Sequence, residues 1–191
     1  METKTIKKLK KYSFVFLITL LLSCMNSYNY EDNLSFYDIK VKTIDGEDFD
    51  LSTLKGKKLL VVNVASKCGL TPQYKQLEEL YKEYKNQNFT VLAFPSSDFA
   101  NQEYSDSQKI SSFCQKNYGV TFPIFEKVSV KGKSKHYIYQ WLTEKNKNGK
   151  KNVSVLWNFQ KFIIDENGQW VDYFLPTTSP KSKKIVKWIN S

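Results

Sequence analysis

The sequence predicts one α/β domain built around a parallel or mixed sheet. Two continuous apolar runs, residues 59–65 and 89–94, have the composition of strands that are buried on both faces. Each run is followed by a stretch with helical spacing of apolar residues, and a hairpin and a last helix come near the end. Strands that alternate with helices in this way are typical of an α/β domain. The 191 residues are enough for one domain with a substantial core.

The N-terminal residues have the pattern of a bacterial secretory signal. Lysines precede a short apolar stretch, residues 14–22, which as a helix would span only about 14 Å of a roughly 30 Å hydrocarbon core. The residues that follow, Leu21-Leu22-Ser23-Cys24, resemble a lipobox, in which the cysteine becomes the lipidated N-terminus of the mature protein. We therefore predict a lipoprotein-type signal peptide over residues 1–23, lipidation of Cys24, and anchoring at the bacterial cell envelope, facing the periplasm or in the outer membrane. The alternative is an ordinary cleaved signal with an incidental cysteine.

The remaining elements are predicted in chain order. Residues 24–34 are polar and form a tether, and residues 35–191 form the domain. Within the domain we expect an N-terminal β-hairpin (36–41 and 48–51, around a turn at 43–46), a helix opening at Thr71-Pro72, a helix from Ser107 to the residue before Gly119, a helix over 137–142, a basic loop over 145–151, a hairpin (159–164 and 170–174), and a helix opening at Ser179-Pro180.

The charge of the chain does not indicate a nucleic-acid partner. The formal net charge is +10, but every basic residue is lysine, and arginine is the residue best suited to bidentate phosphate and base contacts. The lysines are mixed with acidic residues along most of the chain, so a solvated surface explains them. Three cysteines and the single His136 lack the spacing of metal ligands, and no glycine-rich phosphate loop is present. We expect no metal and no cofactor.

Cys68 is the residue whose position points most directly to chemistry. It lies just past the first buried strand and just before a helix, where the helix dipole favours a thiolate, and Lys67 beside it adds positive charge. Ligands of open α/β sheets gather at the carboxyl ends of strands, which argues against the alternative of a buried, inert cysteine. We interpret Cys68 as a nucleophilic thiol.

Five ordered motifs give the sequence a resemblance to a known family. They are NVASKCGLTPQY around Cys68, LAFPSSDF at 92–99, FCQKNYGVTFP at 113–123, Trp157-Asn158-Phe159, and PTTSP at 176–180. Together they resemble the glutathione peroxidase family in its cysteine form, over about residues 36–189. The resemblance implies a thioredoxin-like fold, with a central mixed sheet flanked by helices and an N-terminal β-hairpin.

The resemblance also implies a reaction. Hydrogen peroxide or an organic or lipid hydroperoxide would oxidise Cys68 to a sulfenic acid, and Cys114 would resolve it to an intramolecular disulfide. A thioredoxin-like dithiol, rather than glutathione, would then reduce the disulfide. Trp157 and Asn158 would donate hydrogen bonds around the sulfur. From the residues alone, Cys114 fits equally well as a small apolar residue or in a structural disulfide, and Trp157 as a core aromatic.

Asp98 departs from the pattern of the family, because most members have glutamine at this position. An ionised carboxylate close to Cys68 would oppose formation of the thiolate, yet it could accept the thiol proton, or act as a donor when protonated. The sequence leaves these alternatives open, and Asp98 remains a candidate catalytic residue.

Two other functions and the oligomeric state complete the expectations. Envelope proteins that exchange thiols and disulfides normally carry Cys-x-x-Cys, but position 71 here is threonine. A non-enzymatic redox sensor is the third hypothesis. The region between Phe125 and Trp157 lacks the long insertion associated with tetrameric members, so we expect a monomer.

Overall fold

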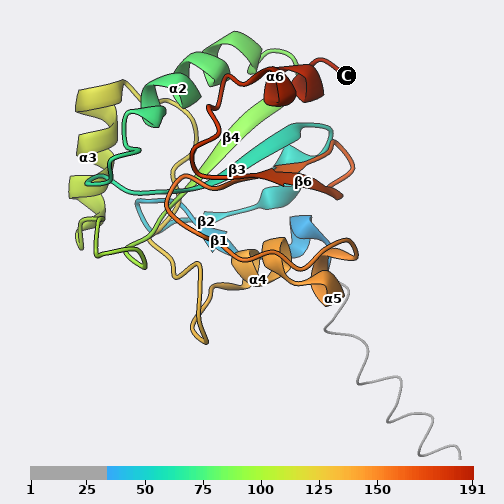
Figure 1. Cartoon of the computed structure of the whole chain (residues 1–191), viewed down its shortest axis with the longest axis horizontal. Helices are drawn as coiled ribbons and strands as arrows, with labels where there is room; N and C mark the ends of the chain where they lie inside the picture. Colours follow the sequence, from blue (N-terminus) through green and yellow to red (C-terminus); the bar gives the residue numbers. More distant parts are fainter. Residues whose placement is uncertain (1–33) are drawn as a thin grey trace, which may run out of the picture. The chain divides into compact units, whose positions relative to one another are not determined.

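The computed structural model describes residues 34–191, so the predicted signal peptide, Cys24 and the tether up to residue 33 lie outside the described residues. The chain divides into two units, Met1–Leu34 and Ser35–Ser191, and the second contains the fold described below. Its centre is a four-stranded sheet in the order β4-β3-β5-β6 (Figure 1). The strands are β3 (Lys58–Val64), β4 (Phe89–Pro95), β5 (Lys161–Ile164) and β6 (Trp170–Phe174).

The sheet is mixed, as predicted. β3 pairs with β4 in parallel, from Lys58 opposite Phe89 to Val64 opposite Pro95, and with β5 in antiparallel orientation. Side chains of β3 alternate between two apolar clusters, with Leu59 and Val61 in one and Leu60, Val62 and Val64 in the other. Both faces of the strand are therefore buried, which explains its continuous apolar run.

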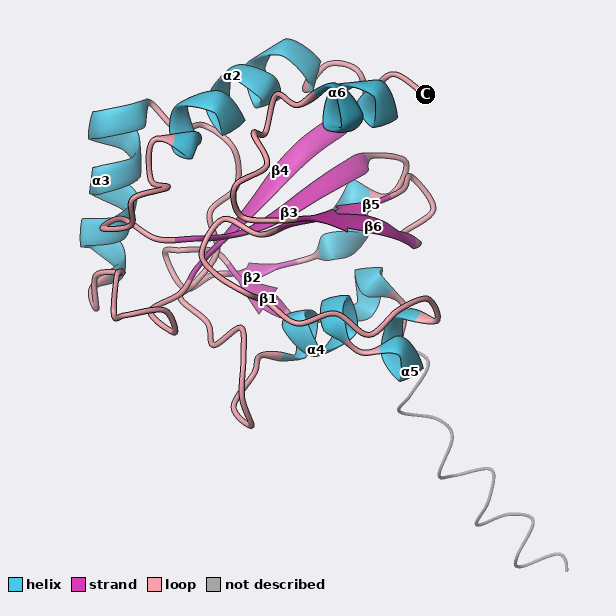
Figure 2. Cartoon of the chain, in the orientation of Figure 1, coloured by secondary structure: helices cyan, strands magenta, loops and turns pink. Residues whose placement is uncertain are grey.

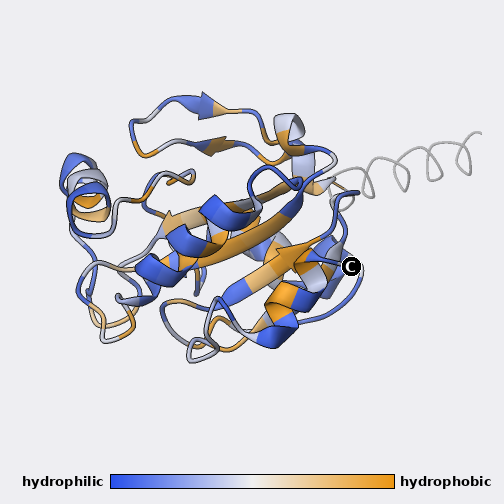
Figure 3. Cartoon of the chain, turned by 90° about the horizontal axis from the view of Figure 1, so that it is seen from above, coloured by the Kyte–Doolittle hydropathy of each residue, from blue (hydrophilic) through white to orange (hydrophobic). Residues whose placement is uncertain are grey.

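Helices cover both faces of this sheet. Helices α2 (Gln73–Tyr84) and α6 (Lys183–Ile189) lie on one side, and α4 (Tyr137–Thr143) and α5 (Lys145–Asn148) on the other (Figure 2). Helix α3 (Ser107–Tyr118) packs near α2 and ends at Gly119, whose φ of 61° forms a left-handed cap. The hydropathy colouring of Figure 3 shows the apolar central strands. Within residues 34–191, no helix combines the length and apolar character needed to cross a membrane.

The N-terminal hairpin is present but shorter than predicted. Only β1 (Val41–Lys42) and β2 (Asp48–Phe49) pair. The expected strand residues 36–38 form a short 3₁₀ helix instead, and so do residues 51–54. In both cases the residue before the turn caps it through a side-chain oxygen, Ser35 in the first and Asp50 in the second. These local hydrogen bonds favour the turn over an extended chain.

Two further boundaries differ from the expectations. The predicted loop 145–151 contains the one-turn helix α5, because the Asn152 side chain accepts the Lys145 N–H at 2.7 Å and Gly149 closes the turn with a φ of 72°. The last helix begins at Lys183 rather than at Ser179-Pro180, with Ser182 as its N-cap residue. The helices that begin near Thr71-Pro72 and at Ser107 are confirmed.

Candidate active site

Cys68 lies in the turn that connects β3 to α2, as its sequence position predicts. The backbone N–H of Cys68 donates to Thr71 Oγ1 at 2.9 Å, and that hydroxyl donates to the Ala65 carbonyl at 2.8 Å. The Leu70 backbone N–H lies 3.4 Å from the Cys68 Sγ, which accepts it. The thiol is 8% exposed. A backbone donor therefore already faces the sulfur, where it stabilises negative charge.

Lys67 and the residues around it form a hollow beside this turn. The Lys67 ammonium lies 4.2 Å from the centre of the Tyr104 ring, so its charge is directed over an aromatic face. Lys109 lies over the same ring at 5.4 Å, and Lys127 lines the same hollow. The hollow has a volume of about 460 Å³. Glu103 also lines the hollow, and burial raises the pKa of its carboxyl above the usual value.

Trp157 and Asn158 are held at the end of β3. The Asn63 side chain, buried in β3, donates to the Trp157 carbonyl at 3.0 Å, and the Phe159 N–H donates to the Asn63 carbonyl. Asn158 is fully buried, and its amide donates to Gln102 Oε1 at 3.1 Å rather than to the sulfur. Trp157 is 39% exposed, which is too much for the alternative of a core aromatic. Its role as a donor to Cys68 stays a prediction.

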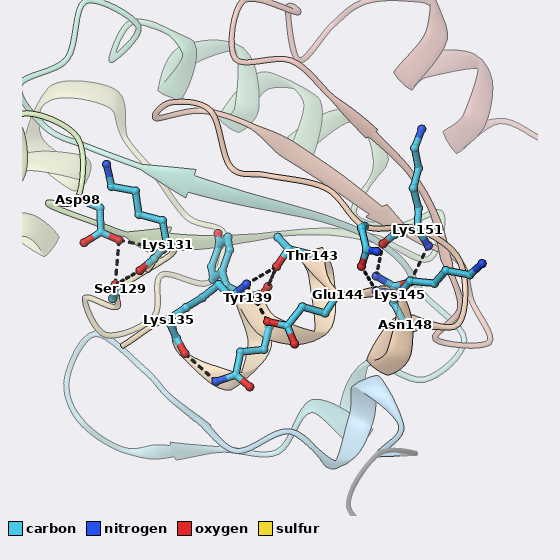
Figure 4. A network of polar contacts seen from close by, with 12 residues as sticks. Asp98, Ser129, Lys131, Lys135, Tyr139, Thr143, Glu144, Lys145, Asn148 and Lys151 are labelled. Carbon is cyan, nitrogen blue, oxygen red and sulfur yellow. Dashed lines mark hydrogen bonds and ion pairs between the residues drawn. The ribbon is translucent and has the colours of Figure 1, made fainter. Parts of the chain in front are cut away.

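Asp98 makes its contacts with a loop of the chain and not with the cysteine turn. Its Oδ2 atom accepts hydrogen bonds from the Val130 N–H at 2.6 Å, the Ser129 hydroxyl at 2.9 Å and the Lys131 N–H at 3.1 Å (Figure 4). Asp98 is followed by Phe99, whose ring packs against that of Trp157 at a centroid distance of 5.2 Å.

Cys114 lies in the middle of α3 and is fully buried. Burial raises the pKa of its thiol to about 11, so the thiol is protonated and unreactive in this position. The hydroxyl of Tyr74 lies beside it and has no other hydrogen-bond partner. Cys68 and Cys114 are both free thiols and belong to the same apolar cluster. This state of the protein therefore holds no structural disulfide between them.

The structure reveals a buried lysine at the site that sequence reasoning missed. Lys161 is fully buried, and its ammonium donates to the side chain of Gln73 and to the carbonyls of Pro176 at 3.0 Å and Thr178 at 2.6 Å. It thereby joins the first residue of α2 to the loop after β6. Burial lowers the pKa of Lys161 to about 7. The sequence did carry a signal for this buried lysine, because it stands within the otherwise largely apolar run FQKFII.

No metal-binding arrangement is found in this part of the chain. His136 caps α4, because its Nδ1 accepts the Ile138 N–H at 3.3 Å, and burial lowers its pKa. Among the described residues no group of three or more His, Cys, Asp and Glu side chains is arranged to hold an ion.

Solved structures define the class of protein to which this fold and site belong. The crystal structure of Trgpx in its apo form matches 83% of the chain and 97% of its own, with 37% identity and a TM-score of 0.64. That of T. cruzi GPX1 matches 82% and 97%, with 35% identity and a TM-score of 0.61. A thiol:disulfide interchange protein of the thioredoxin family from Chlorobium tepidum, only 17% identical, shares the fold alone, with a TM-score of 0.57. The fold is thioredoxin-like, as predicted.

Sequence comparisons give the family. The family model for glutathione peroxidase matches residues 36–143. The glutathione peroxidase homolog BsaA of Halalkalibacterium halodurans is 50% identical over 147 residues, which are 77% of this chain and 93% of that protein. The glutathione peroxidase-like peroxiredoxin 2 of Saccharomyces cerevisiae is 47% identical over 148 residues, 78% of this chain and 91% of that protein. The chain belongs to the glutathione peroxidase family, and it is accordingly a peroxidase, an oxidoreductase.

Proposed function

We propose that the protein is a thiol peroxidase that uses Cys68 as the peroxide-reducing thiol and Cys114 as the resolving thiol. The observation that carries the proposal is the placement of Cys68, in the turn between β3 and α2, with the Leu70 N–H at 3.4 Å from its sulfur. The Leu70 N–H stabilises negative charge that develops on this sulfur during the reaction.

In the first step, the Cys68 thiolate attacks one oxygen of the peroxide and the O–O bond breaks. The sulfur loses two electrons and becomes a sulfenic acid, while the leaving alkoxide or hydroxide takes a proton and departs as alcohol or water. Donors near the sulfur stabilise the charge that develops on these atoms. The Leu70 N–H is one such donor, and Trp157 is proposed as another.

In the second step, the Cys114 sulfur bonds to that of Cys68, and the sulfenic hydroxyl leaves as water. Helix α3 must open for this to happen, because Cys114 is fully enclosed. The helix has 12 residues, of which only Ile110 and Cys114 are buried. Few buried contacts hold it in place, so its local opening requires little free energy compared with global unfolding.

A thioredoxin-like dithiol then reduces the disulfide by thiol–disulfide exchange. The name of the yeast relative, a glutathione peroxidase-like peroxiredoxin, supports this reductant over glutathione. The alternative that the protein exchanges disulfides of other proteins is disfavoured by Thr71, which stands where such proteins carry a second cysteine. Its hydroxyl instead braces the turn between Cys68 and Ala65.

The N-terminal sequence motivates a proposal about location. We propose that the domain is a monomer tethered to the bacterial envelope through a lipid on Cys24, which brings lipid hydroperoxides within its reach. Mass spectrometry of the membrane fraction tests the anchor, and the expected result is a diacylated N-terminal peptide beginning at Cys24. A soluble product with an unmodified cysteine would contradict it.

Stopped-flow oxidation of the full chain by hydrogen peroxide tests the reaction itself. We expect the wild type to react far faster than a free thiol, and Cys68→Ser to react no faster than one. Cys114→Ser should be oxidised in a first turnover, accumulate a sulfenic acid that dimedone traps, and then lose multiple turnover with a thioredoxin. Oxidation of the wild type at the rate of a free thiol would refute the peroxidase mechanism, and full turnover of Cys114→Ser would refute the resolving role.

A further inference from the structure

The environment of Asp98 explains why a carboxylate occupies this position. Three donors from consecutive residues, Ser129, Val130 and Lys131, converge on a single oxygen at 2.9, 2.6 and 3.1 Å. An amide offers one neutral carbonyl oxygen, which would accept these donors without charge assistance. A carboxylate accepts all three with charge assistance. The donor set therefore matches aspartate and does not match the glutamine found in most of the family.

The loop held by Asp98 contacts Phe99, and Phe99 contacts Trp157. Val130 is 1% exposed and lies in the same apolar cluster as Phe99. The Lys131 ammonium lies 4.4 Å from the centre of the Phe99 ring. On the other side, Phe99 contacts Trp157, with the two rings tilted by 45°. A continuous chain of contacts thus leads from Asp98 through the loop and Phe99 to the indole.

Other hydrogen bonds fix the segments on either side of this series of contacts. The Val128 N–H donates to the Pro95 carbonyl at the end of β4, and the His136 N–H donates to the Ser129 carbonyl at 2.8 Å. Trp157 is tied to Asn63 near the end of β3, the strand from which the Cys68 turn departs. Between these fixed points, residues 129–131 depend on Asp98 for three of their hydrogen-bond donors.

We propose that Asp98 is a positioning residue that latches loop 129–131 onto Phe99 and so orients Trp157, and that it does not exchange a proton with Cys68. This inference rests on the proposed function only in assigning Trp157 to the site of that reaction. The Oδ2 atom of Asp98 is occupied by the three loop donors, and none of the hydrogen bonds of Asp98 reaches the cysteine turn. The Leu70 N–H donates to the sulfur, and the indole is the second donor that we propose.

Hydrogen exchange of the full chain tests the latch directly. In Asp98→Asn, we expect the Val130 and Lys131 amides to exchange at least about tenfold faster, because each loses a charge-assisted hydrogen bond. Ser129→Ala removes one donor and keeps the carboxylate, so it should give a smaller acceleration at the same two amides. Asp45→Asn, at an exposed turn residue, makes the same charge change elsewhere and should leave them unaffected. Unchanged protection in both loop variants would overturn the latch.

Two measurements on Cys68 separate positioning from proton transfer. We expect the pH midpoint of Cys68 alkylation to be the same in Asp98→Asn as in the wild type, while the peroxide oxidation rate falls several-fold because the indole is less well held. Asp98→Gln, which installs the amide common in the family, should also lower the rate. A displaced midpoint in Asp98→Asn, or a higher rate in Asp98→Gln, would overturn the proposal.

These outcomes are distinguishable from a failure of the proposed function. If the wild type reacts with peroxide no faster than a free thiol, the peroxidase mechanism fails. The exchange rates of the Val130 and Lys131 amides then still decide whether Asp98 holds the loop, and the alkylation midpoint still decides whether it titrates with Cys68.

Discussion

Weakening the N-terminus of α3 should accelerate disulfide formation rather than slow it. Asp106 caps this helix, with its Oδ1 accepting the Lys109 N–H at 2.7 Å. Removing such a cap by Asp106→Ala costs about 1 kcal/mol of helix stability. In the proposed mechanism α3 opens before Cys114 can react. A loss of about 1 kcal/mol of helix stability should raise the population of the open form about fivefold at 25 °C, where RT is about 0.6 kcal/mol.

The assay separates the two chemical steps. The chain is mixed with one equivalent of hydrogen peroxide and quenched at intervals, and sulfenic acid and disulfide are measured by mass spectrometry after dimedone and thiol labelling. We expect the step from sulfenic acid to disulfide to be about fivefold faster in Asp106→Ala, given the cap energy above. The step that forms the sulfenic acid should be unchanged, since Cys68 lies in a different segment of the chain.

A matched control and a refuting outcome follow from the structure. Asp50 caps the 3₁₀ helix 51–54 in the same way, with its Oδ1 accepting the Ser52 N–H at 2.9 Å, so Asp50→Ala should leave both steps unchanged. An unchanged or slower disulfide step in Asp106→Ala, with hydrogen exchange in α3 accelerated, would refute opening of this helix as the limiting event. Equal acceleration in Asp50→Ala would indicate general loosening of the fold instead.

Three further predictions concern stability. Burial raises the pKa of Glu103. Its contribution to the free energy of unfolding is therefore fully present below the ordinary carboxyl pKa and is lost as the pH rises through the raised value. Glu103→Gln should remove this loss of stability, which urea unfolding across a pH series measures. Burial lowers the pKa of His136, so the cap that it gives α4 is present above its ordinary pKa and is lost as the pH falls through the lowered value. His136→Asn keeps a side-chain acceptor at the cap but does not titrate, so the free energy of unfolding should no longer fall at acid pH. An unchanged fall at acid pH would contradict the role given to His136. Gly168→Ala would place a Cβ 2.5 Å from the Tyr37 ring, whereas Gly46→Ala meets open space at a similarly positive φ. Both variants carry the backbone strain of a left-handed residue, so calorimetry should show the larger fall in melting temperature for Gly168→Ala.

The central strands and the long helices could be predicted from sequence because burial dominates them. β3 and β4 are enclosed on both faces, so nearly all of their buried residues are apolar, with Asn63 and Thr90 as the polar exceptions. The short elements were not predictable in this way. The 3₁₀ turns at 36–38 and 51–54 are capped by the residue before them, and α5 by the side chain of Asn152 beyond its end. Hydrophobic periodicity does not detect such single side-chain hydrogen bonds.

The position of Cys68 in a strand-to-helix turn could be predicted from the sequence, whereas Lys161 and the partners of Asp98 could not. Cys68 is marked by its place between a strand and a helix, which is local information. The acceptors of Lys161 lie on α2 and on the loop after β6, and the donors to Asp98 come from residues 129–131. Such contacts arise only when distant segments fold together, so the alternatives left open for Asp98 could be narrowed only by the fold.

The enclosure of Cys114 also has a consequence for how the enzyme fares in concentrated peroxide. In the mechanism that we propose, each sulfenic acid on Cys68 waits for α3 to open, because Cys114 is 0% exposed. During that interval a second peroxide molecule competes for the same sulfur and carries it to a sulfinic acid, which thiols do not reverse. The opening rate of one helix therefore sets the peroxide dose above which the enzyme inactivates itself. The N-terminal cap at Asp106 stabilises the closed helix by about 1 kcal/mol. It therefore lowers the peroxide concentration at which the enzyme becomes inactivated.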